Sequence, residues 1–149
     1  MEDKIIATNK QAHRDYVILE AVEAGIELKG SEVKSLREAR TNLKDSFGRI
    51  ENSEVFLYNL HISPYEKGSY FNVEPTRTRR LLLHKNQIKR LAAAVAQKGL
   101  TLIPLKLYFK ESFAKVELAL VKGKKFYDKR QDIKKREQDL EIRRALRKK

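Results

Sequence analysis

Alternating apolar and polar residues in the second half of the chain predict a β-hairpin. The segments 103–109 and 114–120 each carry an apolar residue at every second position, which is the period of a half-buried strand. Pro104 lies inside the first segment and cannot donate a hydrogen bond to a neighbouring strand, so we expect it at a sheet edge or a bulge.

Stretches rich in β-branched and aromatic residues predict further strands. They are residues 16–22, 47–50, 55–62 and 80–84. Gly25 follows the first of them and suggests a bulge or sharp bend before residues 26–28. Residues 63–78 contain two prolines and a glycine and are expected to form an irregular loop.

Helical spacing predicts two helices. Apolar residues recur at i, i+3, i+4 and i+7 after Asn86, which we expect to cap a helix that ends at Gly99. Ser31 is expected to cap a shorter helix that carries Val33 and Leu36 on one face. About six strands and two short helices predict a mainly β fold, a small closed antiparallel barrel plugged by helices.

Positive charge is concentrated at the end of the chain. The 149 residues carry 33 Lys and Arg against 20 Asp and Glu, a net charge of +13. Residues 122–149 hold 13 of these cations and 5 of the anions, a net of +8. We therefore expect a barrel domain over residues 1–127 and a basic tail over residues 128–149. The tail has too few apolar residues to pack on the body, so it is predicted to be disordered when free and helical when bound.

Several classes of protein are disfavoured by what the chain lacks. It contains no cysteine, and its first residues lack the apolar stretch of a signal peptide. No run approaches the roughly 20 apolar residues that span a bilayer. We therefore expect a cytoplasmic protein without a membrane partner.

Catalytic patterns fail as well. Gly25 and Gly30 have the spacing of a phosphate-binding loop, but the Lys and Ser or Thr that should follow are missing. Ser31 and Lys34 match a short Ser-x-x-Lys pattern without its companion motifs. The three histidines lack metal-ligand spacing. We expect no catalytic residue, metal or cofactor.

Basic clusters beside apolar or aromatic residues make nucleic acid the favoured partner. Arg77, Arg79 and Arg80 end the irregular loop, and the guanidinium fork suits phosphate and base edges; a solvated charge cluster is the alternative. A Lys-Gly-Lys-Lys run from Lys122 to Lys125 precedes two aromatic rings, which could stack on bases or could simply end the last strand.

Six motifs in order resemble one known family, small protein B, the SsrA-binding protein of bacteria. They are Asn9-Lys10, Glu23-Ala-Gly-Ile-Glu-Leu28, Gly30-Ser-Glu-Val-Lys-Ser-Leu-Arg37, Arg77-Thr-Arg-Arg-Leu-Leu-Leu83, Thr101-Leu-Ile-Pro-Leu-Lys-Leu-Tyr108, and Lys122-Gly-Lys-Lys125 with Asp128-Lys-Arg130. The resemblance runs from about residue 8 to residue 149.

This resemblance implies an oligonucleotide-binding-type barrel with about three helices and a C-terminal tail unfolded in solution. It implies binding to the tRNA-like domain of transfer-messenger RNA and delivery of that RNA to stalled ribosomes in trans-translation. The tail would enter the empty message channel of the small subunit, near the decoding centre and its ribosomal RNA. Elongation factor Tu, through the aminoacylated RNA, is a further implied partner.

The predicted site residues combine this resemblance with the basic clusters. The expected RNA-binding residues are Asn9, Lys10, Glu23, Lys34, Arg37, Arg77, Arg79, Arg80, Leu82, Lys122, Lys124 and Lys125. The expected decoding-site and tail residues are Tyr127, Asp128, Lys129, Arg130, Lys134, Lys135, Arg136 and Leu146.

Two of these residues have open alternatives. Glu23 cannot attract phosphate, so it would accept hydrogen bonds from bases or ribose, orient a basic neighbour, or form a surface ion pair. Leu82 would offer an apolar shelf to a base or fill the barrel.

Other functions remain as alternatives at this point. The nearest is a ribosomal or general RNA-binding protein with a basic tail and no preference for transfer-messenger RNA. An RNA-processing enzyme would need a metal site or a general-base pair, and no such constellation stands out. A structural protein that docks acidic partners is the third.

Overall fold

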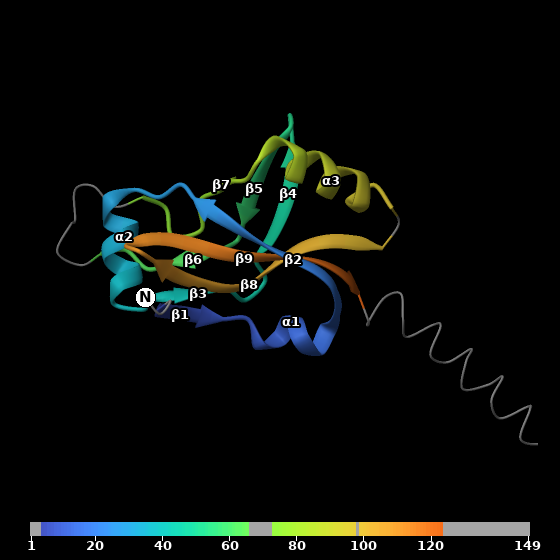
Figure 1. The fold of residues 1–149 in the computed structure, drawn as a ribbon. Helices are drawn as coiled ribbons and strands as arrows, with labels where there is room; N and C mark the ends of the chain where they lie inside the picture. The colour runs from blue at the N-terminus through green and yellow to red at the C-terminus, as the bar shows by residue number, and fades with distance from the viewer. Residues whose placement is uncertain (1–3, 66–72, 98, 124–149) are drawn as a thin grey trace, which may run out of the picture.

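Two long strands, β8 (Leu100–Lys110) and β9 (Phe113–Gly123), form the hairpin on which the fold is built. The computed structural model describes residues 4–65, 73–97 and 99–123 (Figure 1). The other strands are β1 (Lys4–Thr8), β2 (Tyr16–Ile26), β3 (Thr41–Asn42), β4 (Phe47–Glu51), β5 (Glu54–Tyr58), β6 (His61–Ile62) and β7 (Arg79–Leu82). The helices are α1 (Lys10–Asp15), α2 (Gly30–Arg37) and α3 (Lys85–Val95).

Six antiparallel strands close into a ring in the order β8-β4-β5-β7-β2-β9, and β9 returns to β8. Strand β8 is long enough to pair with both β1 and β4 along its other edge. Strands β3 and β6 form a separate two-stranded sheet. Closure leaves the ring without free sheet edges, which suits a small β protein.

The barrel interior is filled by aliphatic side chains from alternate positions of the strands. Leu57, Leu81, Leu107 and Val116 are at most 2% exposed, and Leu91 of α3 is 1% exposed in the same cluster. A second cluster lies between α1 and the outer surface of the β8–β9 hairpin, and comprises Ala12, Ile103, Leu105, Ala119 and Val121.

The predicted fold class is confirmed for the described residues, which form a mainly β closed antiparallel barrel with three helices. The pairing of β8 with β9 shifts between Pro104 and Lys106, so Pro104 does lie at an irregularity of the ladder.

The turn and cap predictions need correction. Strand β2 runs through Gly25, and its irregularity lies between Ile18 and Glu20. Lys29 rather than Ser31 is the N-cap of α2. His84 rather than Asn86 is the N-cap of α3.

The structure also differs from the prediction in one split strand and in two elements that were not predicted. The predicted strand over residues 55–62 is split, because Asn59 has a φ of 63° and this left-handed conformation ends β5. Strand β1 and helix α1 were not predicted from the pattern. Ala12 is the only apolar residue of α1, so its six residues show no helical periodicity. The predicted boundary at residue 127 and the tail beyond it lie outside the described residues.

Candidate nucleic-acid interface

The outward side chains of β7, β2, β9 and β8 form one continuous surface, here called the β2–β9–β8 face. Its members are Leu82, Glu23, Gly25, Lys115, Glu117, Lys106, Tyr108 and Lys110. Their chain neighbours at alternate positions, such as Val116 and Leu107, point into the barrel core. Because side chains alternate between the two faces of a sheet, the members of this surface point away from the core.

The strand registers align these residues in two rows across the sheet. In one row, Leu82 is paired with Gly25, Gly25 with Lys115, and Lys115 with Tyr108. In the next row, Glu23 is paired with Glu117, and Glu117 with Lys106. The face therefore places three lysines, two glutamates, a tyrosine and an exposed leucine within four adjacent strands.

Glu23 is held in place by two side chains of β8. The Tyr108 hydroxyl donates a hydrogen bond of 2.7 Å to Glu23 Oε2, and Lys110 Nζ lies 3.4 Å from the same oxygen. The hydrogen bond from Tyr108, together with the charges of Lys110 and Lys115, lowers the pKa of Glu23 below its usual 4.5. Glu23 is therefore ionised at neutral pH and acts only as a hydrogen-bond acceptor.

The lysines of this face have defined neighbours. Lys106 Nζ lies 3.4 Å from Glu117 Oε2 and 5.3 Å from the centroid of the Tyr108 ring. Both lysine and tyrosine are thereby oriented, since a cation over an aromatic face is attracted by its quadrupole. Such half-exposed lysines are suited to phosphate contacts.

Leu82 remains 49% exposed although it is a leucine in a strand. It lies over Gly25, where a Cβ atom would come within 3.2 Å of the Leu82 Cβ. Any larger residue in place of Gly25 would therefore have to push Leu82 aside. This close approach, rather than a bend, is what the structure requires of Gly25, and it leaves Leu82 as an apolar shelf on the face.

Arg79 is a correction to the predicted site. Its side chain is 0% exposed, and Glu32 Oε2 accepts a hydrogen bond of 2.6 Å from its Nε. Its terminal nitrogens donate to the carbonyl oxygens of Leu60 at 2.6 Å, Arg77 at 3.1 Å and Pro75 at 3.0 Å. A phosphate cannot reach this guanidinium, so Arg79 is a structural residue and not an RNA contact.

Arg77 belongs to the same network. Its Nε lies 3.2 Å from both carboxylate oxygens of Glu32, and one terminal nitrogen donates a hydrogen bond of 2.5 Å to Oε1. Glu32 is only 3% exposed and also caps α2 by accepting a hydrogen bond from the Lys29 backbone N–H. Here the basic loop end and the Gly30–Arg37 helix are joined by one buried carboxylate.

Arg80 lies on the outer surface but is paired with acids. Its guanidinium is 2.8 Å from Glu27 and 3.1 Å from Glu54. The hydrogen bond from Arg80 to Glu54 and the nearby Glu27 carboxylate raise the pKa of Arg80. A phosphate would have to compete with both carboxylates for this side chain.

The remaining described candidates are exposed or partly exposed. Lys10 starts α1, Lys34 and Arg37 are exposed on α2, and Lys122 lies near the end of β9. Lys34 Nζ lies 5.5 Å from the centroid of the Tyr65 ring. The candidates Lys124, Lys125, Tyr127, Asp128, Lys129, Arg130, Lys134, Lys135, Arg136 and Leu146 lie outside the described residues.

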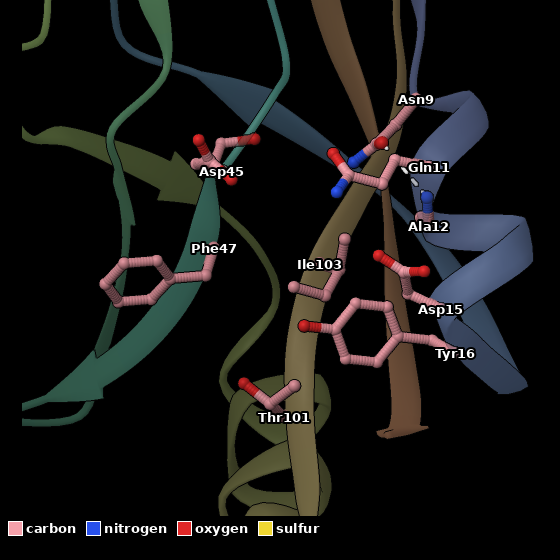
Figure 2. A pocket seen from close by; sticks show the side chains of 10 residues that line it. Asn9, Gln11, Ala12, Asp15, Tyr16, Asp45, Phe47, Thr101 and Ile103 are labelled. Atoms are coloured by element: carbon pink, nitrogen blue, oxygen red, sulfur yellow. Dashed lines mark hydrogen bonds between the residues drawn. The ribbon is translucent and has the colours of Figure 1, made fainter. Parts of the chain in front are cut away.

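Asn9 has a structural role that the sequence did not show. It is 8% exposed, its Oδ1 accepts a hydrogen bond from the Ala12 N–H, and its Nδ2 donates to the Pro104 carbonyl oxygen. Figure 2 shows Asn9 at the start of α1, with its hydrogen bond to Ala12. Asn9 thus caps α1 and fixes it to β8.

Asn9 also lines a pocket of about 300 Å³ between α1, β4 and β8 (Figure 2). Asp15 and Asp45 are among the residues that line it. Because carboxylates repel phosphate, this pocket is a poor site for an RNA backbone. The pocket lining contains no lysine or arginine, whereas the β2–β9–β8 face carries three lysines beside its two glutamates and is therefore the better surface.

The residues that sequence reasoning missed are Lys106, Tyr108, Lys110 and Lys115. Lys106, Tyr108 and Lys115 occupy positions between the apolar residues of the two alternating segments, and Lys110 directly follows the first segment. These segments were analysed for their apolar positions only. Lysine at 106, 110 and 115 was the available signal for a basic sheet face. Tyr108 is only 4% exposed, so it contributes the hydrogen bond to Glu23 rather than an exposed ring.

Two further findings concern the described residues. They contain no cluster of three or more His, Cys, Asp or Glu side chains that could hold a metal ion. Within the same ranges, none of the helices combines the length and the apolar character needed to cross a membrane.

Comparisons with known proteins agree over nearly the whole chain. The family model for the SmpB protein matches residues 6–148. The SsrA-binding protein of Caldicellulosiruptor bescii is 65% identical over 143 residues, which cover 96% of this chain and 90% of that protein. The SsrA-binding protein of Carboxydothermus hydrogenoformans is 61% identical over 145 residues, 97% of each chain.

The fold is similar to a solved structure as well. A chain from a study described as "tmRNA-SmpB: a journey to the center of the bacterial ribosome" superposes with a TM-score of 0.70 and 57% sequence identity. The match covers 83% of this chain and 87% of that chain. Together with the family match over residues 6–148, these similarities show that the chain belongs to the SmpB family, the SsrA-binding proteins.

Proposed function

We propose that this protein is a non-catalytic adaptor that binds transfer-messenger RNA, the SsrA RNA, and acts with it on stalled ribosomes in trans-translation. The observation that carries the proposal is its membership of the SmpB family over residues 6–148. The structure adds a suitable surface, because Glu23 and Leu82 lie together on the β2–β9–β8 face among three lysines.

The chemistry of this face fits a folded RNA with exposed bases. Lys106 and Lys115 can contact phosphates, and Leu82 offers an apolar surface to a base. The fixed, ionised carboxylate of Glu23 can accept hydrogen bonds from base amino groups or ribose hydroxyls. A mixed face of this kind reads RNA shape and base edges as well as charge.

At the ribosome, we assign the basic tail to the vacant message channel near the decoding centre, where it would fold on binding ribosomal RNA. Residues 128–149 have the composition of a segment that orders only on its target. Elongation factor Tu would contact the complex through the aminoacylated RNA. All of these steps would take place in the cytoplasm, with the protein holding and positioning RNA without any chemistry of its own.

Single substitutions of two surface glutamates, one on the face and one away from it, test the RNA-binding face. Glu23→Ala is expected to weaken binding to the tRNA-like domain of transfer-messenger RNA about tenfold or more, because a hydrogen bond to a charged group is lost. Fluorescence anisotropy at near-physiological salt measures the change. The matched control is Glu54→Ala, which removes another exposed glutamate, on β5.

The control makes the direction of the effect decisive. Removing a negative charge near a polyanion should by itself tighten binding in both variants. Weaker binding by Glu23→Ala alone therefore identifies a specific acceptor. Unchanged or tighter binding by both variants would remove Glu23 from the interface.

A further inference from the structure

Phe113 is the most exposed of the large apolar side chains in the described part of the chain. It is 69% exposed and belongs to neither of the two core clusters. It starts β9, directly after the turn that joins it to β8. An aromatic ring stabilises a fold when it is buried. Because Phe113 is exposed, packing within the barrel does not account for a phenylalanine at this position.

The turn before Phe113 has an uncommon backbone. Glu111 has a φ of 50° and Ser112 a φ of 74°, so both central residues of this two-residue turn are left-handed although neither is glycine. Left-handed turns of this type continue the twist of the strands into a tight tip. The turn thus holds Phe113 in register with Lys110 at the end of the hairpin.

Phe113 points to the same side as the proposed RNA-binding face. It precedes Lys115 and Glu117 at alternate positions of β9, and no register shift occurs between them. Its register partner Lys110 contacts Glu23. Two strand spacings and two residues along β9 separate Phe113 from Leu82, which is roughly 12 Å.

We propose that the Phe113 ring is a base-stacking platform, on which an unpaired nucleobase of the bound RNA stacks while Lys110 and Lys115 hold the flanking phosphates. The inference rests on the proposed function and extends its interface to the hairpin tip. Stacking on an aromatic ring needs an exposed π face near cations, and the tip supplies both. The proposal requires the bound RNA to present an unpaired and accessible base to the hairpin tip.

The chain contains no tryptophan, which allows a direct optical test. Phe113→Trp introduces a single indole at the tip, and stacking on a base is expected to quench its fluorescence on addition of the tRNA-like domain. The control is Ala93→Trp, an exposed position on α3, and this helix lies at the end of the barrel where β8 begins, away from the β8–β9 turn (Figure 1). Phe113→Ala should bind this RNA about tenfold more weakly, Phe113→Leu should also bind more weakly, and Phe113→Trp should keep the parent affinity.

The outcomes separate this inference from the proposed function. If the parent protein prefers the tRNA-like domain over ordinary tRNA but Phe113→Ala binds equally well, the stacking platform is wrong and the function stands. If Phe113→Ala binds weakly but the indole of Phe113→Trp is not quenched, the ring acts through another contact and the proposal is overturned. If the parent shows no preference, the proposed function itself has failed. Thermal melting checks that each variant is folded.

Discussion

Replacing Glu32 with glutamine is expected to lower the free energy of unfolding by about 3–5 kcal/mol, because it leaves two arginines without their shared anion. Arg79 is 0% exposed and Arg77 is about a quarter exposed. The neutral amide keeps the volume of the side chain but cannot balance a buried guanidinium. Urea unfolding at pH 7 measures the loss as a lower transition midpoint with an unchanged slope.

Glu54 on β5, which pairs with an arginine at the surface, provides the matched control. Glu54 is 46% exposed and pairs with Arg80, which is 43% exposed. Glu54→Gln should cost at most about 1 kcal/mol, because exposed ion pairs are screened by water and salt. If both variants lose the same free energy of unfolding, burial does not make the Glu32 ion pairs more stabilising than an exposed ion pair.

The same network predicts how stability changes with pH. Burial alone would raise the pKa of Glu32, but hydrogen bonds from Arg77, the Lys29 backbone and Arg79 bring the pKa below its usual 4.5. A carboxyl group with a lowered pKa in the folded state stabilises the fold above its unfolded pKa and loses this effect as pH falls through the folded pKa. The parent should therefore lose stability below about pH 4.5, and Glu32→Gln should lack this part of the acid dependence.

Ending the chain at Tyr127 is expected to abolish tagging of nascent chains on stalled ribosomes while leaving RNA binding largely intact. The barrel with its β2–β9–β8 face remains, whereas residues 128–149, assigned to the message channel, are removed. A reconstituted translation reaction on a message without a stop codon measures the tagged product. Anisotropy with the tRNA-like domain measures binding by the same preparation.

A variant with residues 128–149 scrambled separates charge from sequence. It keeps the composition of the tail and therefore its cations. If the tail acts through its particular residues, the scrambled tail should fail in tagging as the truncation does. Normal tagging by the truncated protein would refute the division into an RNA-binding barrel and a ribosome-binding tail.

Short-range patterns predicted the strands and helices that bury much surface. The period-2 segments of β8 and β9 and the 3.6-residue spacing of α3 are visible in the sequence because burial imposes them. Helix α1 escaped prediction because Ala12 is its only apolar residue, whereas Ile88, Leu91 and Val95 of α3 all pack against the core. Strand β1 is a short segment without a buried member.

Contacts between distant parts of the chain could not be predicted. Arg77, Arg79 and Arg80 are equivalent candidates in the sequence, yet their environments differ. Arg79 is fully buried, whereas Arg80 forms ion pairs with Glu27 and Glu54 on the surface. The buried position of Arg79 depends on its hydrogen bond to Glu32, which is 47 residues away in the chain. The family resemblance named Glu23 and Leu82, but only the strand registers show that they share a face with Lys115.

The most direct test of the account compares two RNAs of similar size. Fluorescence anisotropy at near-physiological salt gives the affinity of the full chain for the tRNA-like domain of transfer-messenger RNA and for an ordinary elongator tRNA. The account predicts at least tenfold tighter binding to the tRNA-like domain, or about 1.4 kcal/mol. Equal affinities for the two RNAs, both falling steeply with salt, would contradict it and indicate a general RNA-binding protein that acts through charge alone.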